Sequence, residues 1–324
     1  MDRGGAGDGT NTGAPRRSTL GNVKPRIPLP PALAGRPFTA RQGLAAGLGP
    51  HRLRGGDLQR PFHGVILPAN IEPDFILLCR SLVGRLPDNA FFCGIAAAKI
   101  LCIPLPYRHE NSRIVDVGVP APVFPPSGRG IRGHMLRLDP QSIRRWNDVP
   151  ITTPEQTWCD LGGLLSIPEL VAAGDYLIQW RSPLTGVDSL SAAVTKRTRQ
   201  RGVIRLRAAL ELLNDRSESP QESKLRVVLT DARLPGLSVN FPITTSDGYR
   251  YRADLAFPER KLVIEYQSAF HENPASFRDD MTRISRLEAD DWRVMQVNKE
   301  DIATRVELVA RIRRTLSGRP HFAR

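Results

Sequence analysis

The sequence predicts a multi-domain α/β protein, and three observations lead to that prediction. The chain has 324 residues, which is enough for two modest domains that each bury a core. Segments with the two-residue period of strands alternate with segments that have the 3.6-residue period of helices. Charge is divided unevenly, because residues 1–215 hold 27 Lys and Arg against 17 Asp and Glu, whereas residues 216–324 hold 19 against 16.

The net charge of +13, concentrated in the front part of the chain, favours an anionic partner. Nucleic acid ranks before a membrane surface for such a charge balance. No run of 18 apolar residues is present, and the first 35 residues lack the apolar stretch of a secretory signal. The cysteines form no CxxC pair and are interpreted as reduced, buried thiols. We therefore expect a cytoplasmic protein without a membrane-spanning helix.

Residues 1–35 are rich in Gly, Pro, Thr and Arg, lack an apolar period and are predicted to be a disordered basic tail. Residues 36–68 have the pattern of a small winged helix, with two short helices followed by a hairpin between Leu58 and Leu67. The candidate contacts to nucleic acid in this unit are four arginines, Arg41, Arg52, Arg54 and Arg60. Helix-turn-helix patterns are weak signals, so a small helical unit with a solvated basic face is the alternative.

Residues 69–190 are expected to form a mixed α/β middle segment, with strands at 114–120 and 133–138. No catalytic constellation is recognisable in it. Residues 191–218 are predicted to be a basic linker helix, because 196–207 holds six basic residues and no acidic one. Such a run is usually a solvated face, and contact with phosphates is the second interpretation.

Residues 219–324 carry the clearest signal, with the predicted order helix, three strands, helix, strand and helix. The second strand is expected to begin at Tyr249 and to place its odd-numbered residues, as far as Phe257, on one face. Strand 261–267 follows after a tight turn, and its Leu262, Ile264 and Tyr266 are expected to share a face.

Two carboxylates, Asp254 and Glu265, lie on adjacent strands of this predicted hairpin, and Gln267 follows on the same face as Glu265. Glu265 interrupts an apolar run in an expected central strand, where a buried position is given to Glu mainly for function. Glu222 lies in the first turn of the preceding helix.

Simpler explanations exist for two of these acids. Glu222 occupies the third position of a capping box begun by Ser219, which needs no metal. Asp254 could pair with Arg252 on a surface of the sheet, a routine arrangement that contributes little to stability.

These residues and this order of elements resemble the PD-(D/E)XK nuclease superfamily, most closely its Vsr-like (very-short-patch-repair) endonucleases. The motifs that carry the resemblance are ESKLR, RADLAF, VIEYQ and FRDDMTRISRLEADDWRVMQV. It covers about a third of the chain and implies a C-terminal restriction-endonuclease-like αβββαβα domain, 219–324, with a mixed sheet. The front part, roughly 37–178, is similar to AbiEi-type antitoxin winged-helix proteins of actinobacteria through PFTARQGLAAGLGPHRLRGGDLQRPFHGVILP and ITTPEQTWCDL.

The nuclease resemblance implies phosphodiester hydrolysis assisted by Mg²⁺ or Mn²⁺, which oxygen ligands bind. The implied metal ligands are the side chains of Asp254, Glu265 and Glu222 and the carbonyl oxygen of Tyr266. The implied catalytic residues are Glu222, Asp254, Glu265, Gln267 and His271.

Two of these positions need comment. Gln267 stands where the superfamily usually has Lys, and an amide orients water by hydrogen bonds but carries no charge. His271 stands where the Vsr-like branch commonly has His, and either acts as a general acid or is a solvated loop residue. Arg278 and Arg283 are expected on the polar side of the following helix, where they hold phosphates or form ion pairs along that helix.

The leading hypothesis is a metal-dependent DNA endonuclease whose front part supplies affinity for DNA. The alternative is a non-enzymatic, AbiEi-like DNA-binding antitoxin or transcriptional repressor that keeps a degenerate nuclease fold. A pure protein-interaction module is the third reading, and the basic front part argues against it. A toxin partner or a homodimer stays open.

Overall fold

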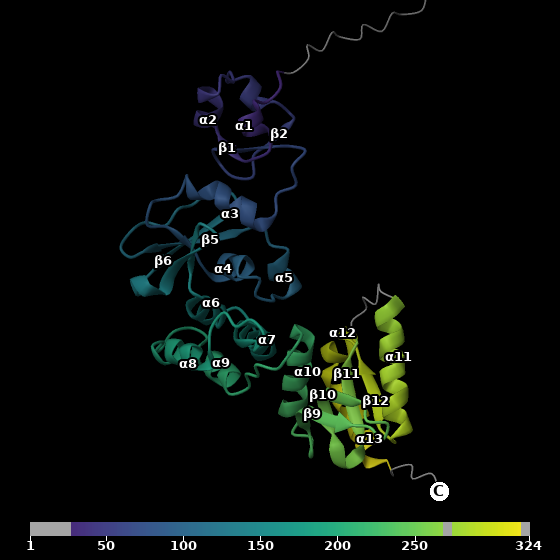
Figure 1. Cartoon of the computed structure of the whole chain (residues 1–324). Coiled ribbons are helices and arrows are strands. Elements are labelled where there is room, and N and C mark those ends of the chain that lie inside the picture. Colours follow the sequence, from purple (N-terminus) through teal and green to yellow (C-terminus); the bar gives the residue numbers. More distant parts are fainter. Residues whose placement is uncertain (1–26, 268–273, 319–324) are drawn as a thin grey trace, which may run out of the picture.

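The computed structural model describes residues 27–267 and 274–318, and Figure 1 shows them as three successive units. Each unit has its own sheet, with strand orders β1-β3-β2, β6-β5-β4-β8-β7 and β12-β11-β10-β9. The prediction of a mixed α/β protein built from several parts is confirmed. No helix among the described residues is both long and apolar enough to cross a lipid bilayer.

The first unit is small and is held by a core of six apolar side chains around Phe38 and Ile66. Its elements are α1 (Pro31–Ala34), β1 (Phe38–Thr39), α2 (Ala40–Ala45), the 3₁₀ turn η1 (Arg52–Arg54), β2 (Leu58–Gln59) and β3 (Val65–Pro68). A capping box between Thr39 and Gln42 begins α2. The predicted hairpin is present as β2 and β3, whereas the predicted second helix is reduced to the single turn η1.

The second unit is the largest and contains the five-stranded sheet. Its elements up to the sheet's last strand are α3 (Phe75–Val83), β4 (Phe91–Phe92), α4 (Gly94–Ile100), α5 (Tyr107–Glu110), β5 (Val115–Pro120), β6 (Ile131–Leu136), η2 (Pro140–Ser142), β7 (Ile143–Trp146) and β8 (Val149–Thr152). Four helices follow, α6 (Pro154–Leu161), α7 (Ile167–Ile178), α8 (Val187–Thr195) and α9 (Val203–Leu210). The strands expected at 114–120 and 133–138 are β5 and β6.

Two helices, α8 and α9, occupy the stretch where one basic linker helix is predicted. They are separated at Gly202, whose φ is +87° and whose missing Cβ would lie 2.2 Å from the backbone of Gly162. Leu190 and Leu206 are fully buried in the core of the second unit. This segment is therefore part of that unit, and the six basic residues do not form one solvated face, since Arg197 is bound to Asp160 at 2.5 Å.

The third unit has the predicted order, with its last helix divided in two. Its elements are α10 (Pro220–Asp231), β9 (Ser238–Thr244), β10 (Arg250–Phe257), η3 (Pro258–Arg260), β11 (Leu262–Tyr266), α11 (Pro274–Ala289), β12 (Arg293–Val297), α12 (Lys299–Ala303) and α13 (Arg305–Ser317). Strands β9, β10 and β11 form an antiparallel meander, and β12 is parallel to β11. The parallel pair requires a crossover, which α11 provides.

The sheet of the third unit buries both faces, and strand β10 changes face halfway along its length. Ala253 packs in the apolar cluster under α11, but Leu255 and Phe257 pack in the cluster under α10 and α13. The prediction that odd-numbered residues of this strand share one face is therefore wrong. The change occurs at Asp254, opposite Asn240, whose φ is +54°. The prediction for β11 is confirmed, because Leu262 and Ile264 share one cluster.

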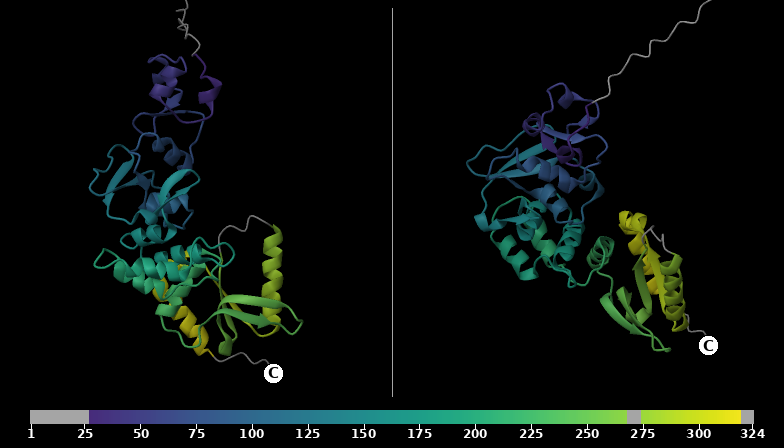
Figure 2. Two further views of the ribbon diagram at one scale, coloured as in Figure 1. Left: turned by 60° about the vertical axis from the view of Figure 1, so that its left-hand side comes forward. Right: turned by 45° about the horizontal axis from the view of Figure 1, so that its top comes forward.

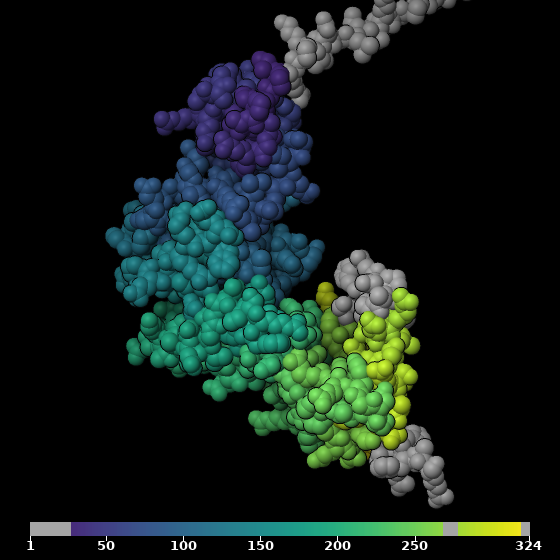
Figure 3. Space-filling model, viewed as in Figure 1, coloured from purple at the N-terminus to yellow at the C-terminus, as the bar shows by residue number. Residues whose placement is uncertain are grey.

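Helix α10 is shared between the second and third units. Leu225 and Leu229 lie in the core of the third unit, whereas Val227 lies in the core of the second. The second face of α10 packs on α7. Both views of Figure 2 place α10 between the two units, and the space-filling view in Figure 3 shows their surfaces joined there.

Candidate functional site

The candidate site lies where the first turn of α10 meets the distorted part of the β9–β10 hairpin. Glu222 of α10 and Asp254 of β10 line one small pocket, together with Asn240 and Arg226. Two of the predicted acids, 32 residues apart in the sequence, are thus brought together. The distortion at Asn240 and Asp254 accompanies this approach, because it occurs where the strand leaves its regular alternation.

Glu222 lies in the predicted cap of α10, but its carboxylate accepts from Glu218 rather than from Ser219, so the full capping box does not form. Its backbone N–H donates to the Ser219 hydroxyl at 3.1 Å, and its Oε2 accepts from the backbone N–H of Glu218 at 3.0 Å. These contacts hold the carboxylate at the helix N-terminus, where a negative charge is stabilised. Its Oε1 accepts no hydrogen bond from the described residues, so one oxygen stays available to a ligand.

Asp254 is partly buried, yet it accepts no hydrogen bond and forms no ion pair within the described part of the chain. Burial raises the pKa of Asp254 to about 7, and the negative charge of Glu222 adds to the increase. The predicted surface pair with Arg252 is absent, because the Arg252 guanidinium binds Glu218 at 2.9 Å instead. The charge of Arg252 opposes this increase in the pKa of Asp254, but burial and Glu222 outweigh it.

Glu265 is in the opposite situation. It is 8% exposed, and its Oε1 accepts from the Tyr251 hydroxyl at 2.7 Å. Its Oε2 is paired with Arg283 at 2.9 Å, and the Arg283 guanidinium also lies over the Tyr251 ring at 5.3 Å. Burial and the neighbouring Glu265 carboxylate raise the pKa of Tyr251, so its hydroxyl stays a donor. The apolar run VIEYQ contains Glu265 because these two partners satisfy it.

Arg283 is consequently not an available phosphate contact, and its pair with Asp280 at 3.0 Å is the ion pair along the helix that was the alternative expectation. Arg283 lies four residues before Leu287, which is fully buried against the sheet, so both side chains share the inner face of α11. Arg278, the other arginine predicted on this helix, is exposed.

The three acids do not form one ligand set. Among the described residues, no group of three or more His, Cys, Asp and Glu side chains is placed to hold a metal ion. Glu265 is turned toward α11, whereas Glu222 and Asp254 meet beside α10. The carboxylate oxygens of Asp254 and the Oε1 of Glu222 remain to bind a cation.

The remaining predicted residues lie near the end of β11. The Tyr266 ring packs against the core under α10 and α13. The Gln267 backbone N–H donates to the Val297 carbonyl at 2.8 Å, and its side chain is half-buried. His271 lies outside the described residues.

Of the four arginines predicted to contact nucleic acid in the first unit, Arg41 and Arg54 are exposed. Arg52 is 8% exposed, pairs with Asp57 at 2.7 Å and donates to the Ile27 carbonyl, so its prediction as a contact is wrong. It sits in the turn η1, which packs inward, rather than on a helix that presents it to solvent. The Arg60 guanidinium donates to the Leu53 carbonyl, although most of the residue is exposed.

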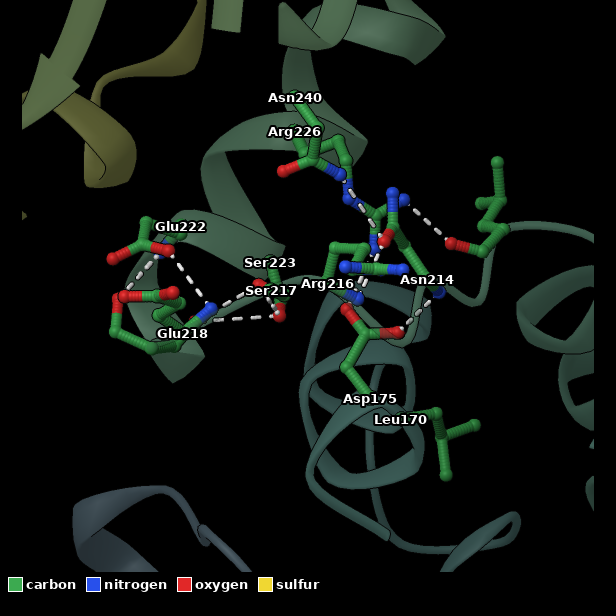
Figure 4. A network of polar contacts seen from close by, with 12 residues as sticks. Leu170, Asp175, Asn214, Arg216, Ser217, Glu218, Glu222, Ser223, Arg226 and Asn240 are labelled. Carbon is green, nitrogen blue, oxygen red and sulfur yellow. Dashed lines mark hydrogen bonds and ion pairs between the residues drawn. The ribbon is translucent and has the colours of Figure 1, made fainter. Parts of the chain in front are cut away.

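The structure contains a buried ion pair between α7 and α10 (Figure 4). The sequence did not predict this pair. Arg226 donates to Oδ2 of Asp175 at 2.6 Å and to the Leu212 carbonyl at 2.5 Å. The backbone N–H of Asn214 donates to Oδ1 of Asp175 at 2.7 Å. Burial raises the pKa of Asp175, which Arg226 opposes. The isolated Asp in the apolar stretch LVAAGDYLI was the available signal.

This ion pair fixes the helix that carries Glu222. Ser223, next to Glu222, is 1% exposed and exchanges a hydrogen bond with Ser217 at 2.8 Å. The second unit therefore positions one side of the candidate site, although it contributes none of the predicted carboxylates.

No family model matches the chain. The chain is 28% identical over 270 residues to two proteins of Mycobacterium tuberculosis, the uncharacterized protein MT2308 of strain CDC 1551 / Oshkosh and the uncharacterized protein Rv2248 of strain H37Rv. In each case the match covers 82% of this chain and 94% of the relative. The crystal structure of the RV2827C protein from Mycobacterium tuberculosis matches with a TM-score of 0.35 and 15% identity, over 59% of this chain and 75% of that one.

Proposed function

We propose that the third unit binds a divalent cation at Asp254 and Glu222 and hydrolyses phosphodiester bonds of nucleic acid, with DNA as the expected substrate. The observation that carries the proposal is the Asp254 carboxyl, which has no donor within the described chain and faces the carboxylate of Glu222. Two carboxylates this close are mutually unfavourable until a proton or a cation joins them. Mg²⁺ and Mn²⁺ prefer oxygen ligands, which suits a site with two carboxylates.

Each residue near the pocket then has a definable task. A bound Mg²⁺ or Mn²⁺ ion polarises the phosphoryl oxygen and activates the attacking water. Asp254 and Oε1 of Glu222 would hold the ion, whereas Gln267 does not line this pocket and its amide is given no role in it. Glu265, held by Tyr251 and Arg283, adds negative potential to the site without ligating.

Two further observations support the proposal. The order α10-β9-β10-β11-α11-β12, with β12 parallel to β11, is the arrangement that the resemblance to the PD-(D/E)XK superfamily implies. Residues 1–215 hold 27 basic and 17 acidic residues, and this surplus of positive charge supplies affinity for a polyanion.

The test compares the full-length wild type with D254N and E222Q after metal has been removed by chelation. We expect Mn²⁺ titration heat and nicking of supercoiled plasmid in the wild type. In D254N we expect the titration heat to vanish and cleavage to fall at least about 100-fold. E259Q, which changes an exposed carboxylate of the same unit, is the matched control and should behave as wild type.

The proposal fails if D254N cleaves as well as the wild type. It also fails if the wild type gives neither Mn²⁺ heat nor cleavage of plasmid, single-stranded DNA and RNA.

A second candidate function is a non-enzymatic DNA-binding protein, such as an antitoxin-like repressor. The capture of Glu265 by Arg283, together with Gln267 in the place of Lys, favours it. This second function predicts salt-dependent DNA binding, no heat in the Mn²⁺ titration, and equal DNA binding by the wild type and D254N. Removal of residues 1–68 would then abolish most of the affinity.

A further inference from the structure

Trp180, just after α7, is the tryptophan whose exposure the fold leaves unexplained. The chain has four tryptophans. Trp158 is fully buried, and Trp146 and Trp292 pack against apolar clusters. Trp180 is 45% exposed and belongs to none of the four clusters. Packing therefore explains three of the four.

Two arginines flank the Trp180 ring. The Arg181 guanidinium lies 5.2 Å from the ring centre, and the Arg216 guanidinium lies 5.1 Å from it. Both arginine side chains are more than half exposed. A large exposed indole between two cations is the combination with which proteins bind an unpaired base and its phosphates.

The loop that carries the indole is held in place and borders an open depression. The Trp180 backbone N–H donates to the Asp215 carbonyl at 3.1 Å, which ties the loop after α7 to the loop after α9. The depression has a volume of about 890 Å³, and its walls include Leu184, Asn214 and Asn240. That volume accommodates a nucleotide-sized group.

This depression adjoins the Asp254 pocket. Asn214 and Asn240 line both. Glu218 joins Arg181, beside the indole, to Arg252, two residues before Asp254, because its Oε1 accepts from them at 3.3 and 2.9 Å. At the ring itself Arg181 and Arg216 lie beside Asp215, whereas the acids Glu222 and Asp254 belong to the adjoining pocket.

We propose that Trp180, flanked by Arg181 and Arg216, stacks an unpaired base of a single-stranded nucleic acid. The identity of the substrate rests on the proposed function. The strand that reaches Asp254 would be single-stranded, or would have one base unstacked, where it contacts Trp180. Stacking is tolerant of sequence, since every base has a π face. A protein partner is the competing occupant, but the two cations favour a polyanion.

The test measures fluorescence anisotropy of labelled oligonucleotides with the full-length protein in EDTA, which prevents cleavage. The probes are a 15-nucleotide oligo-dT, the matching oligo-rU and a 15-base-pair duplex. W180A is expected to weaken binding of oligo-dT at least about fivefold, which is the low end of one base stack. Binding of the duplex should change less than twofold, and W180F should retain most of the oligo-dT affinity.

The matched control is F124A, which removes a 91% exposed ring of the same unit. It should bind all three probes as the wild type does. Intrinsic fluorescence gives an independent readout, because saturating oligo-dT should quench emission in the wild type but not in W180A. The oligo-rU arm shows whether the site distinguishes DNA from RNA.

Equal binding of oligo-dT by W180A and the wild type would overturn the proposal. So would a change of sedimentation coefficient in W180A with unchanged oligonucleotide binding, which would assign Trp180 to a protein interface. Loss of affinity equally for all probes in both W180A and W180F would also count against it. Failure of this proposal can be distinguished from failure of the proposed function. D254N should still bind oligo-dT in EDTA, whereas W180A should still give heat in the Mn²⁺ titration.

Discussion

Asp254 and Glu265 lie opposite one another on adjacent strands, yet their surroundings differ completely. Helix α11 brings Arg283 to Glu265, and β10 adds the Tyr251 hydroxyl. Helix α10 brings a second carboxylate, Glu222, to Asp254. Both side chains are carboxylates on adjacent strands, so the difference comes from the helix that covers each face. A carboxylate whose oxygens all have donors has a structural role. A carboxylate that lacks donors in a partly buried position is a candidate to bind a ligand.

The largest effect on stability is expected from the most completely paired carboxylate, Asp175. R226A leaves this acid buried without its cation and should lower the free energy of unfolding by about 3–5 kcal/mol. Urea unfolding followed by circular dichroism measures it. The double variant D175N/R226M removes both charges and should recover most of the loss; if it does not, the cost arises from packing rather than from the orphaned charge.

R283A extends the comparison to Glu265. The Tyr251 hydroxyl remains, so we expect a smaller loss of about 2–3 kcal/mol in the free energy of unfolding. R286A, on an exposed position of the same helix, serves as the control. A loss in R283A no greater than in R286A would mean that Glu265 is not held by its arginine.

D254N should act in the opposite direction and stabilise the metal-free protein. The folded-state pKa of Asp254, about 7, lies above its ordinary value of 3.8, so the folded state binds the extra proton between these limits. The stability that this proton provides is complete below pH 4 and is lost as the pH rises through 7. The free energy of unfolding of D254N should therefore exceed that of the wild type by about 1–2 kcal/mol at pH 8.

The advantage of D254N should shrink toward pH 5, and Mn²⁺ should raise the melting temperature of the wild type only. Thermal melts at pH 5 and 8 test both statements. An equal difference at the two pH values would show that Asp254 does not titrate as described.

The smallest effect is expected at Glu169, which is paired near the surface. Burial opposes ionisation, but Arg108 and the Ser166 N–H hold the pKa of Glu169 at about 2. Its stabilisation is present above pH 4.5 and is lost as the pH falls toward 2, the reverse of Asp254. Since Arg108 is 54% exposed, R108A should cost only about 0.5 kcal/mol at pH 7, measured by urea unfolding.

The sequence was sufficient for the elements whose signals are local. The cap at Ser219, the strands β5 and β6 and the alternation of Leu262 and Ile264 all follow from periodicity or capping, and the structure contains them. The order of elements in the third unit is local in the same sense, since each has its own pattern.

Features that depend on packing between distant segments were not predicted. The change of face at Asp254 requires Asn240 on the neighbouring strand to adopt a positive φ. The inward direction of Arg283 and of Arg52 depends on what lies under each element. Of the candidate site, Glu222 and Asp254 were predicted to meet and do so, whereas Glu265 was expected with them and lies on the other face.

Helix α10 has no side that belongs to a single unit, since Val227 and Leu225 enter different cores. Cutting the chain before Ser219 would expose Ser223, Arg226 and Val227, which are buried in the intact protein, so the third unit is not a portable module. Heat should accordingly melt both portions in one cooperative calorimetric peak rather than in succession. A domain transplant of the third unit must therefore carry α7 along with it.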